Sequence, residues 1–135
     1  MSPSRPLALV LMAAAASCGG ASDPVSGTSA PTLLVVQAQV FTPRCALPGC
    51  HVGAAAPFGM NLQSASTSAT NLIGVPSGEM PGLMRVAPGD SANSYLYWKV
   101  TGNPNIGGDP MPLTGGPLSN SELALIASWI DGGAN

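Results

Sequence analysis

Two cysteines and the histidine of this chain occur together, and their side chains can bind a metal or change redox state. Residues 45–51 read Cys-Ala-Leu-Pro-Gly-Cys-His and contain two of the three cysteines and the single histidine of the 135-residue sequence. Thiolates are soft metal ligands, imidazole binds most transition metals, and neighbouring thiols can oxidise to a disulfide. We therefore expect the functional chemistry of the protein at this segment.

These residue types leave three kinds of site open. A disulfide between Cys45 and Cys50 closes a short loop and stabilises the fold by about 2 kcal/mol in the chain-entropy relation. Copper or zinc would use the two thiolates, His51 and a methionine, although a structural zinc site usually takes four Cys or His ligands. The segment also resembles a c-type haem attachment site, in which both thiols bond to the porphyrin and the adjacent histidine ligates the iron.

The two residues Pro48 and Gly49 lie inside the cysteine pair. Common haem attachment sites have two residues between the cysteines, whereas this chain has four. Proline followed by glycine favours a sharp turn. We therefore expect the additional residues to bulge outward while both sulfurs face the same way.

A methionine in a rigid setting is the candidate for a ligand on the opposite side. Residues 103–117 contain so much glycine and proline that we expect a loop, and Met111 lies in it between two prolines. The proline rings restrict the backbone and hold the thioether in one direction. Met80 is the alternative ligand, while Met60 and Met84 are expected to be core or loop residues.

Composition predicts a single loop-rich domain with a thin core. The chain has 17 glycines and 14 prolines, charged residues are 7% of it, hydrophobic residues are 45%, and the net charge is −2. So small a net charge does not hold a chain open by repulsion. A thin core gains stability from a large apolar cofactor. The four basic residues are scattered along the sequence and give no sign of nucleic-acid binding.

The elements that position the segment 45–51 begin with a short helix. Residues 33–41 carry apolar side chains at helical spacing, Gln37 and Gln39 are expected to face water, and Pro43 ends the helix. Residues 52–86 are expected to be mostly loop, because their apolar residues are too scattered for a long amphipathic helix.

Two further helices are predicted after these loops. Residues 94–100 form a short one that ends at Gly102. The last is the clearest, because Ser119 and Glu122 form a capping box and apolar residues then recur on one face. We expect this face to pack against the helix at residues 33–41.

The N-terminus resembles an export signal. Residues 1–17 contain a basic residue and then an apolar run too short to span a bilayer, and small residues lead into Cys18. This order resembles the lipidation site of bacterial lipoproteins, which implies a lipid anchor on Cys18. An ordinary secretory signal, with Cys18 left as a spare thiol, is the alternative. Residues 18–32 are rich in small residues and are expected to be a flexible linker.

From residue 33 to residue 135, the order of these features resembles a small mono-haem cytochrome c domain of bacterial envelope proteins. A helix leads into the cysteine and histidine segment, a loop carries Met-Pro, and Pro-Leu-Ser precedes a helix that ends Trp-Ile-Asp-Gly-Gly-Ala. The resemblance implies a mostly α fold with short helices, crossed terminal helices and long Gly/Pro-rich loops. Cysteine spacings longer than the common one also occur in this family.

The resemblance further implies one covalent haem c, with Cys45 and Cys50 as the thioether attachments, His51 as the proximal ligand and Met111 as the distal ligand. Such a protein exchanges electrons with redox partner proteins of the envelope and needs no substrate turnover. We therefore expect an exported electron carrier, periplasmic or anchored at the outer membrane, and not an enzyme. The alternative is a haem-free, disulfide-stapled surface lipoprotein that acts as a binding or structural module.

Overall fold

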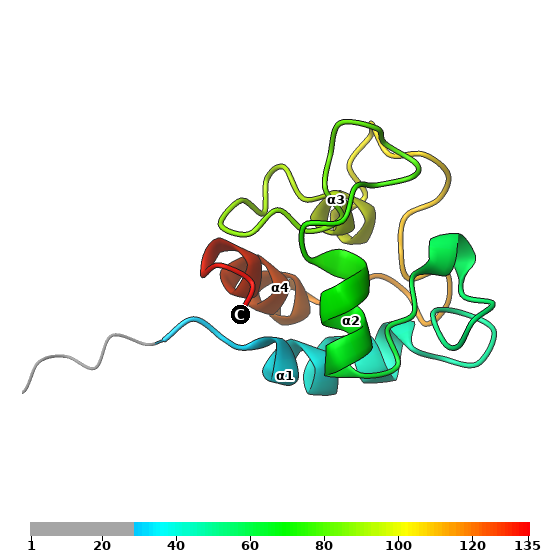
Figure 1. Ribbon diagram of the computed structural model, residues 1–135, viewed down its shortest axis with the longest axis horizontal. Helices are drawn as coiled ribbons and strands as arrows, with labels where there is room; N and C mark the ends of the chain where they lie inside the picture. Colours follow the sequence, from blue (N-terminus) through cyan, green and yellow to red (C-terminus); the bar gives the residue numbers. More distant parts are fainter. Residues whose placement is uncertain (1–28) are drawn as a thin grey trace, which may run out of the picture.

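The computed structural model describes residues 29–135, in which the first helix begins at Leu33. The predicted signal peptide, Cys18 and the linker up to residue 28 lie outside this range. The helical elements, in order, are α1 (Leu33–Val36), the π-helix η1 (Gln37–Cys45), the 3-10 turn η2 (Pro57–Gly59), α2 (Ala65–Leu72), α3 (Tyr95–Thr101) and α4 (Asn120–Asp131) (Figure 1). Between residues 29 and 135 no strand forms, and extended pairing is limited to three isolated bridges.

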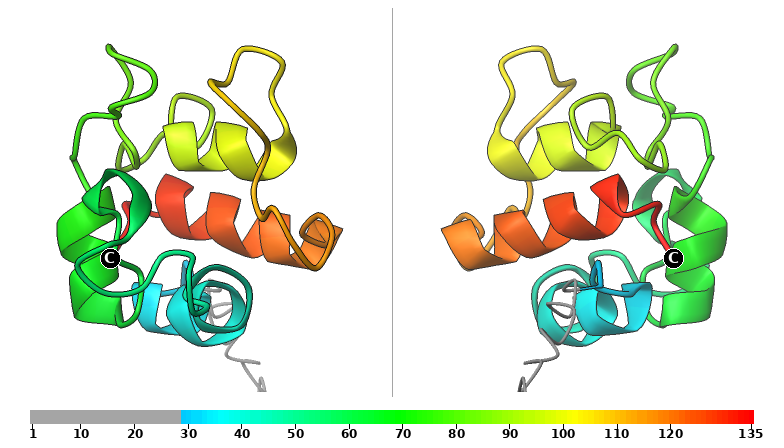
Figure 2. Two further views of the ribbon diagram at one scale, coloured as in Figure 1. Left: turned by 90° about the vertical axis from the view of Figure 1, so that its right-hand side faces the viewer. Right: turned by 90° about the vertical axis from the view of Figure 1, so that its left-hand side faces the viewer.

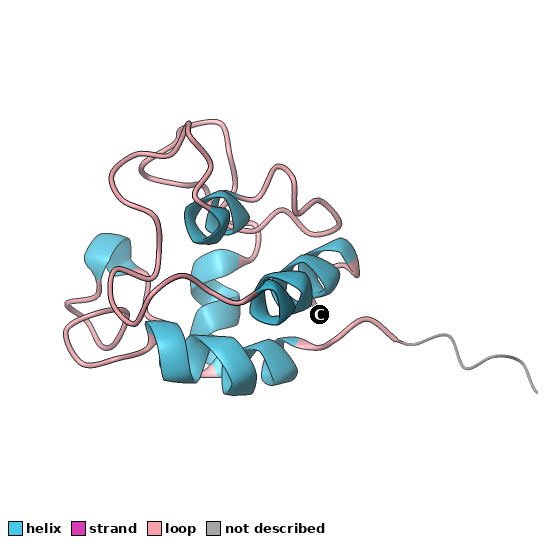
Figure 3. Cartoon of the chain, turned by 180° about the vertical axis from the view of Figure 1, so that it is seen from behind, coloured by secondary structure: helices cyan, strands magenta, loops and turns pink. Residues whose placement is uncertain are grey.

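Long loops connect these short helices. Figure 3 shows long loops around α3 at one end of the molecule. The loop after α3 then runs to η1, where Arg44 donates to the carbonyls of Gly115, Gly116 and Pro117. Residues 103–117 contain no helix, as predicted from their glycine and proline content. The mostly α fold with short helices and long Gly/Pro-rich loops is therefore confirmed.

The N-terminal helix is longer than predicted. We expected Pro43 to end it, but η1 continues directly from α1 and includes Pro43 before it ends at Cys45. A proline removes one backbone donor and crowds the carbonyl four residues earlier. In π turns each N–H pairs with the carbonyl five residues earlier instead of four. The N–H of Ala46 accordingly donates to the carbonyl of Phe41 at 2.7 Å. Cys45 is thus the last residue of a helix and not part of a loop.

The prediction that Gln37 faces water is wrong. Residues 52–86 are mostly loop, as predicted, but they also contain the eight-residue helix α2. Gln37 is only 7% exposed. Its Nε2 atom donates to the carbonyl of Leu62 at 2.8 Å, and its Oε1 atom accepts from Ser68 Oγ at 2.7 Å. Ser68 belongs to α2, a helix that has few apolar residues and begins with reciprocal hydrogen bonds between Ser64 and Thr67. The buried amide therefore joins η1 to a helix that the sequence pattern did not reveal.

The first and last helices pack against each other in the core. The rings of Phe41 and Trp129 meet edge to face, with centroids 6.1 Å apart, and both side chains have no exposed surface. Burying such side chains contributes about 1.5 to 3 kcal/mol each. Figures 1 and 2 show α1 and η1 running across α4, which lies between them and α3.

The C-terminal helix and α3 form as predicted. Ser119 accepts from the N–H of Glu122 while the carboxylate of Glu122 accepts from the N–H of Ser119, so the capping box is confirmed. Gly102 ends α3 in a left-handed conformation with φ of 70°.

No helix among residues 29–135 combines the length and the apolar character needed to cross a membrane.

Candidate functional site

A tight turn separates the two cysteines of the segment 45–51. The N–H of Cys50 donates to the carbonyl of Leu47 at 2.9 Å, and Gly49 has φ of 79°. Proline followed by a residue with positive φ defines a type II turn. Pro48 and Gly49 are exposed while Cys45 and Cys50 are half-buried. The predicted outward bulge of the additional residues is therefore confirmed.

His51 is held at three points. Its N–H donates to the carbonyl of Cys45 at 3.2 Å, and its carbonyl accepts from the N–H of Leu62 at 2.8 Å. The ring atom Nδ1 lies 3.1 Å from the carbonyl oxygen of Met60. Because a carbonyl only accepts, this contact places the ring proton of neutral His51 on Nδ1. The lone pair of Nε2 remains for a ligand.

The surroundings of His51 favour its neutral form. Burial lowers the pKa of its imidazole below the ordinary value of 6.5, and the nearby charges of Arg85 and Lys99 lower it further. The hydrogen bond to Met60 opposes this shift without overcoming it. His51 is therefore uncharged at neutral pH, which is the state that ligates metals.

The two cysteines are free thiols in the structure. Burial raises the pKa of the Cys45 thiol to about 11; the positive charge of Arg44 opposes this rise, whereas Glu122 and Cys50 add to it. A thiol with so high a pKa is protonated at neutral pH and is a slow nucleophile. Within residues 29–135, neither cysteine is joined in a disulfide.

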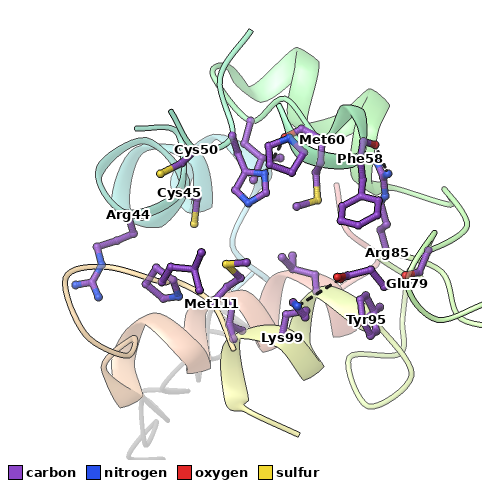
Figure 4. Close-up of a pocket in the computed structure, with 18 of the residues that line it drawn as sticks. Arg44, Cys45, Cys50, Phe58, Met60, Glu79, Arg85, Tyr95, Lys99 and Met111 are labelled. Atoms are coloured by element: carbon purple, nitrogen blue, oxygen red, sulfur yellow. Dashed lines mark hydrogen bonds and ion pairs between the residues drawn. The ribbon is translucent and has the colours of Figure 1, made fainter. Parts of the chain in front are cut away.

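All four predicted haem-site residues of the domain line one pocket (Figure 4). The pocket contains about 1090 Å³ of space not occupied by atoms, part of it open to solvent. Apolar side chains form much of its wall: Pro57, Phe58, Met60, Leu62, Leu96, Val100, Pro112 and Leu113. A largely apolar cleft with a few convergent polar groups is typical of a cofactor site.

The structure separates the methionine candidates. Met111 and Met60 line the pocket, whereas Met80 does not. Figure 4 shows Met111 on the opposite side of the pocket from Met60, Cys45 and Cys50. Because His51 bonds to the backbone of Met60, the Met60 side chain starts from the histidine side. Met111 is thus the candidate methionine across the pocket from Met60, and Met60 is a lining residue that the sequence pattern did not single out.

One end of the pocket carries charged side chains. Arg85, Lys99, Glu79 and Tyr95 line it away from Cys45 and Cys50 (Figure 4). With Arg44 near the cysteines, three of the four basic residues of the chain line this pocket, and Glu79 is the one acidic residue that lines it. Residues scattered in sequence therefore give the pocket a net positive lining.

The guanidinium of Arg85 joins η2 to α2 at this end. It donates to the carbonyl of Phe58 at 2.7 Å and to that of Asn71 at 2.9 Å. These two bonds leave further N–H groups of the guanidinium for an anion. Arg85 and Tyr95 thus lie in the same pocket as the four predicted haem-site residues.

The copper or zinc alternative gains no support from the geometry. Among residues 29–135, no three Cys, His, Asp or Glu side chains converge closely enough to hold a metal ion. Cys45, Cys50 and His51 line a pocket instead of pointing at a common centre. For covalent haem this spread is suitable, because the thiols then bond to the rim of the porphyrin and only histidine ligates the metal.

Comparison of the chain with models of protein families, with curated proteins and with solved structures finds no match.

Proposed function

We propose that this chain is a haem-binding electron-transfer protein of the cell envelope, with one covalent haem c. The observation that carries the proposal is the arrangement of His51. Its Nδ1 is engaged by the Met60 carbonyl at 3.1 Å, and it lines the same pocket as Cys45, Cys50 and Met111. A backbone carbonyl on Nδ1 is the outer contact that fixes a metal-ligating imidazole.

The residues present fit the chemical character of a haem. A porphyrin is a flat apolar ring with carboxylates on one edge, and the pocket has apolar walls with basic residues at one end. Arg85, Lys99 and Tyr95 at that end suit the carboxylates, because each offers N–H or O–H donors or a positive charge. Cys45 and Cys50 at the other side suit covalent attachment.

In this proposal Cys45 and Cys50 would hold the haem covalently, each through a thioether made by addition of its thiol to a vinyl group, which consumes no oxidant or reductant. Both thiols must be reduced for this attachment. A disulfide between them would block attachment until it is reduced.

Bound haem supplies reversible one-electron chemistry at its iron. His51 would hold the group through Nε2, because its proton is fixed on Nδ1 and its pKa is lowered. Met111 would supply the second ligand, and a thioether in this role raises the reduction potential relative to a second histidine. The apolar walls lower the local polarity, which would strengthen this effect. No substrate turnover is part of this function.

The proposal includes export of the protein. Residues 1–17 would direct export, and Cys18 would carry a lipid anchor that leaves the domain in the periplasm or at the outer membrane. Envelope redox proteins are then the partners. Haem is attached to exported chains, so the proposed cofactor and the proposed location agree with each other.

An absorption spectrum of the exported protein tests the proposal. The protein, produced with the haem-attachment machinery, should be red, and its Soret band should remain with the polypeptide after denaturation and extraction with acid-acetone. The double variant Cys45→Ser/Cys50→Ser should lose this retained band. Colourless wild-type protein would support the alternative, a haem-free surface lipoprotein stapled by a disulfide.

A further inference from the structure

We infer that Tyr95 and Lys99 are positioning residues for Met111, because together they fasten the loop that presents its thioether. Neither residue is expected to touch the iron. The effect on haem ligation rests on the proposed function. The contacts from which we draw the inference are all within the polypeptide.

The two side chains both bind Gly107, one residue of the loop. Tyr95 and Lys99 are four residues apart on α3 and therefore lie on the same face of that helix. The N–H of Gly107 donates to the hydroxyl oxygen of Tyr95 at 2.9 Å, and the carbonyl of Gly107 accepts from Lys99 Nζ at 2.7 Å. Both backbone polar groups of Gly107 are thus bound by α3.

Lys99 also binds Met111 itself. The N–H of Met111 donates to the backbone carbonyl of Lys99 at 2.8 Å. Lys99 therefore holds the loop at Gly107 through its side chain and at Met111 through its backbone. Only residues 108–110 lie between these two attachments, so the direction of the methionine backbone is closely restrained.

The burial of Lys99 shows that its side chain is not a solvated surface group. Lys99 is only 7% exposed. Its ammonium lies 3.3 Å from a carboxylate oxygen of Glu79 and 5.9 Å from the ring centroid of Tyr95. Burying an ammonium is costly unless it is paired and hydrogen-bonded. Glu79 and Gly107 supply these partners, so the lysine is held where it can restrain the loop.

A looser loop would change how often Met111 faces His51. If the clamp formed by Tyr95 and Lys99 is removed, the loop opens more often, because local opening depends on the contacts that close it. An added ligand that binds only when Met111 is displaced gains affinity in proportion to the open fraction. The clamp should therefore control competition at the methionine position.

Two variants and one control test the inference on protein recovered from the periplasm. Tyr95→Phe removes only the hydroxyl that accepts from Gly107, and Lys99→Met removes the ammonium but keeps the backbone carbonyl. The control, Ser68→Ala, deletes a buried hydrogen bond of 2.7 Å to Gln37, away from the pocket. Tyr95→Phe keeps the ring in place and serves if Lys99→Met fails to fold.

Amide hydrogen exchange is the readout that does not need haem. The exchange rates of the Gly107 and Met111 amides should rise on the order of tenfold in Tyr95→Phe and Lys99→Met, the change expected for one lost hydrogen bond. Ser68→Ala should leave both rates unchanged. Equal rates in all three variants and the wild type would overturn the clamp, whether or not haem is present.

Imidazole binding to the ferric protein is the second readout. Both clamp variants should bind imidazole about tenfold more tightly than the wild type, and Ser68→Ala should bind it as the wild type does. Faster exchange with unchanged imidazole affinity would overturn the role in positioning Met111. Failure to recover any haem would contradict the proposed function instead, and the exchange rates would still decide whether the clamp exists.

Discussion

The Nδ1 atom of His51 lies 3.1 Å from the carbonyl oxygen of Met60. This contact fixes the tautomer of the imidazole and places Nε2 as its remaining ligand atom. It also gives Met60 a role through its backbone, on the histidine side of the pocket. The sulfur of Met111 then faces that side from the loop beyond α3 (Figure 4).

Substitution of the methionines should separate their roles. Met111→Ala is expected to abolish the weak absorption near the red end of the spectrum that methionine-ligated ferric haem shows, and to lower the reduction potential. Met60→Ala keeps the carbonyl that binds His51, and Met80 does not line the pocket. Met60→Ala and Met80→Ala should therefore retain the band. Loss of the band only in Met80→Ala would move the distal role to that residue.

The thiol of Cys45 should alkylate slowly in the folded, haem-free protein. Its pKa is raised to about 11 by burial. At pH 8 the thiolate is then only about one part in a thousand, and the rate should rise about tenfold per pH unit between pH 7 and 9.5. Mass spectrometry of the Cys45 peptide after iodoacetamide treatment measures this rate.

Denatured protein provides the control for the alkylation series. There the rate at Cys45 should level off near the ordinary thiol pKa of about 8.5. The same levelling in the folded protein would show that the Cys45 thiol is exposed to water, which would contradict its burial in the structure.

The capping box of α4 should make stability depend on pH. Hydrogen bonds from the backbone N–H and the hydroxyl of Ser119 lower the pKa of Glu122 below its ordinary value of 4.5. Because the folded pKa is the lower one, the stabilisation is present above about pH 4.5 and is lost as pH falls through the folded pKa. Glu122→Gln should flatten the decline in unfolding free energy between pH 5 and 3, measured in urea.

Ser119→Ala offers a second measure of the same cap. It should lower the unfolding free energy at pH 7 by about 1 kcal/mol, the usual effect of losing an N-cap side chain. Ser128→Ala, at an exposed position later in α4, is the matched substitution and should cost less. Equal losses at both positions would contradict the cap.

The edge-to-face pair of Phe41 and Trp129 should be a major source of stability. Phe41→Ala is expected to lower the unfolding free energy by about 3 to 5 kcal/mol, because the side chain has no exposed surface and leaves a cavity. Phe41→Leu, which retains most of the volume, should cost clearly less. Urea denaturation measures the unfolding free energy of both variants. Similar decreases in the two variants would contradict the prediction that the volume of the Phe41 side chain is what stabilises the core.

Local signals in the sequence were sufficient for some of these features. The capping box at Ser119 and Glu122 and the turn at Pro48 and Gly49 involve only residues close in sequence, and both are found as predicted. By contrast, α2 has few apolar residues, and it is stabilised by Ser68 bonding to a glutamine from another helix. A Ser followed three residues later by Thr, at positions 64 and 67, was its one local sign.

The charged end of the pocket was beyond the reach of sequence patterns. Arg85 and Lys99 are separated by a turn and a helix boundary, and only the folded chain brings them together around one cavity. The same is true of Gly107, whose link to Tyr95 and Lys99 spans a loop without periodicity. Contacts between distant residues, unlike caps and turns, leave no recurrent spacing to read.

Mass spectrometry of the peptide that contains residues 45–51, isolated from protein matured in the periplasm, tests the central claim most directly. We predict one porphyrin bonded to this peptide through both Cys45 and Cys50. A peptide in which the two sulfurs are joined only to each other, with no porphyrin attached, would contradict the account.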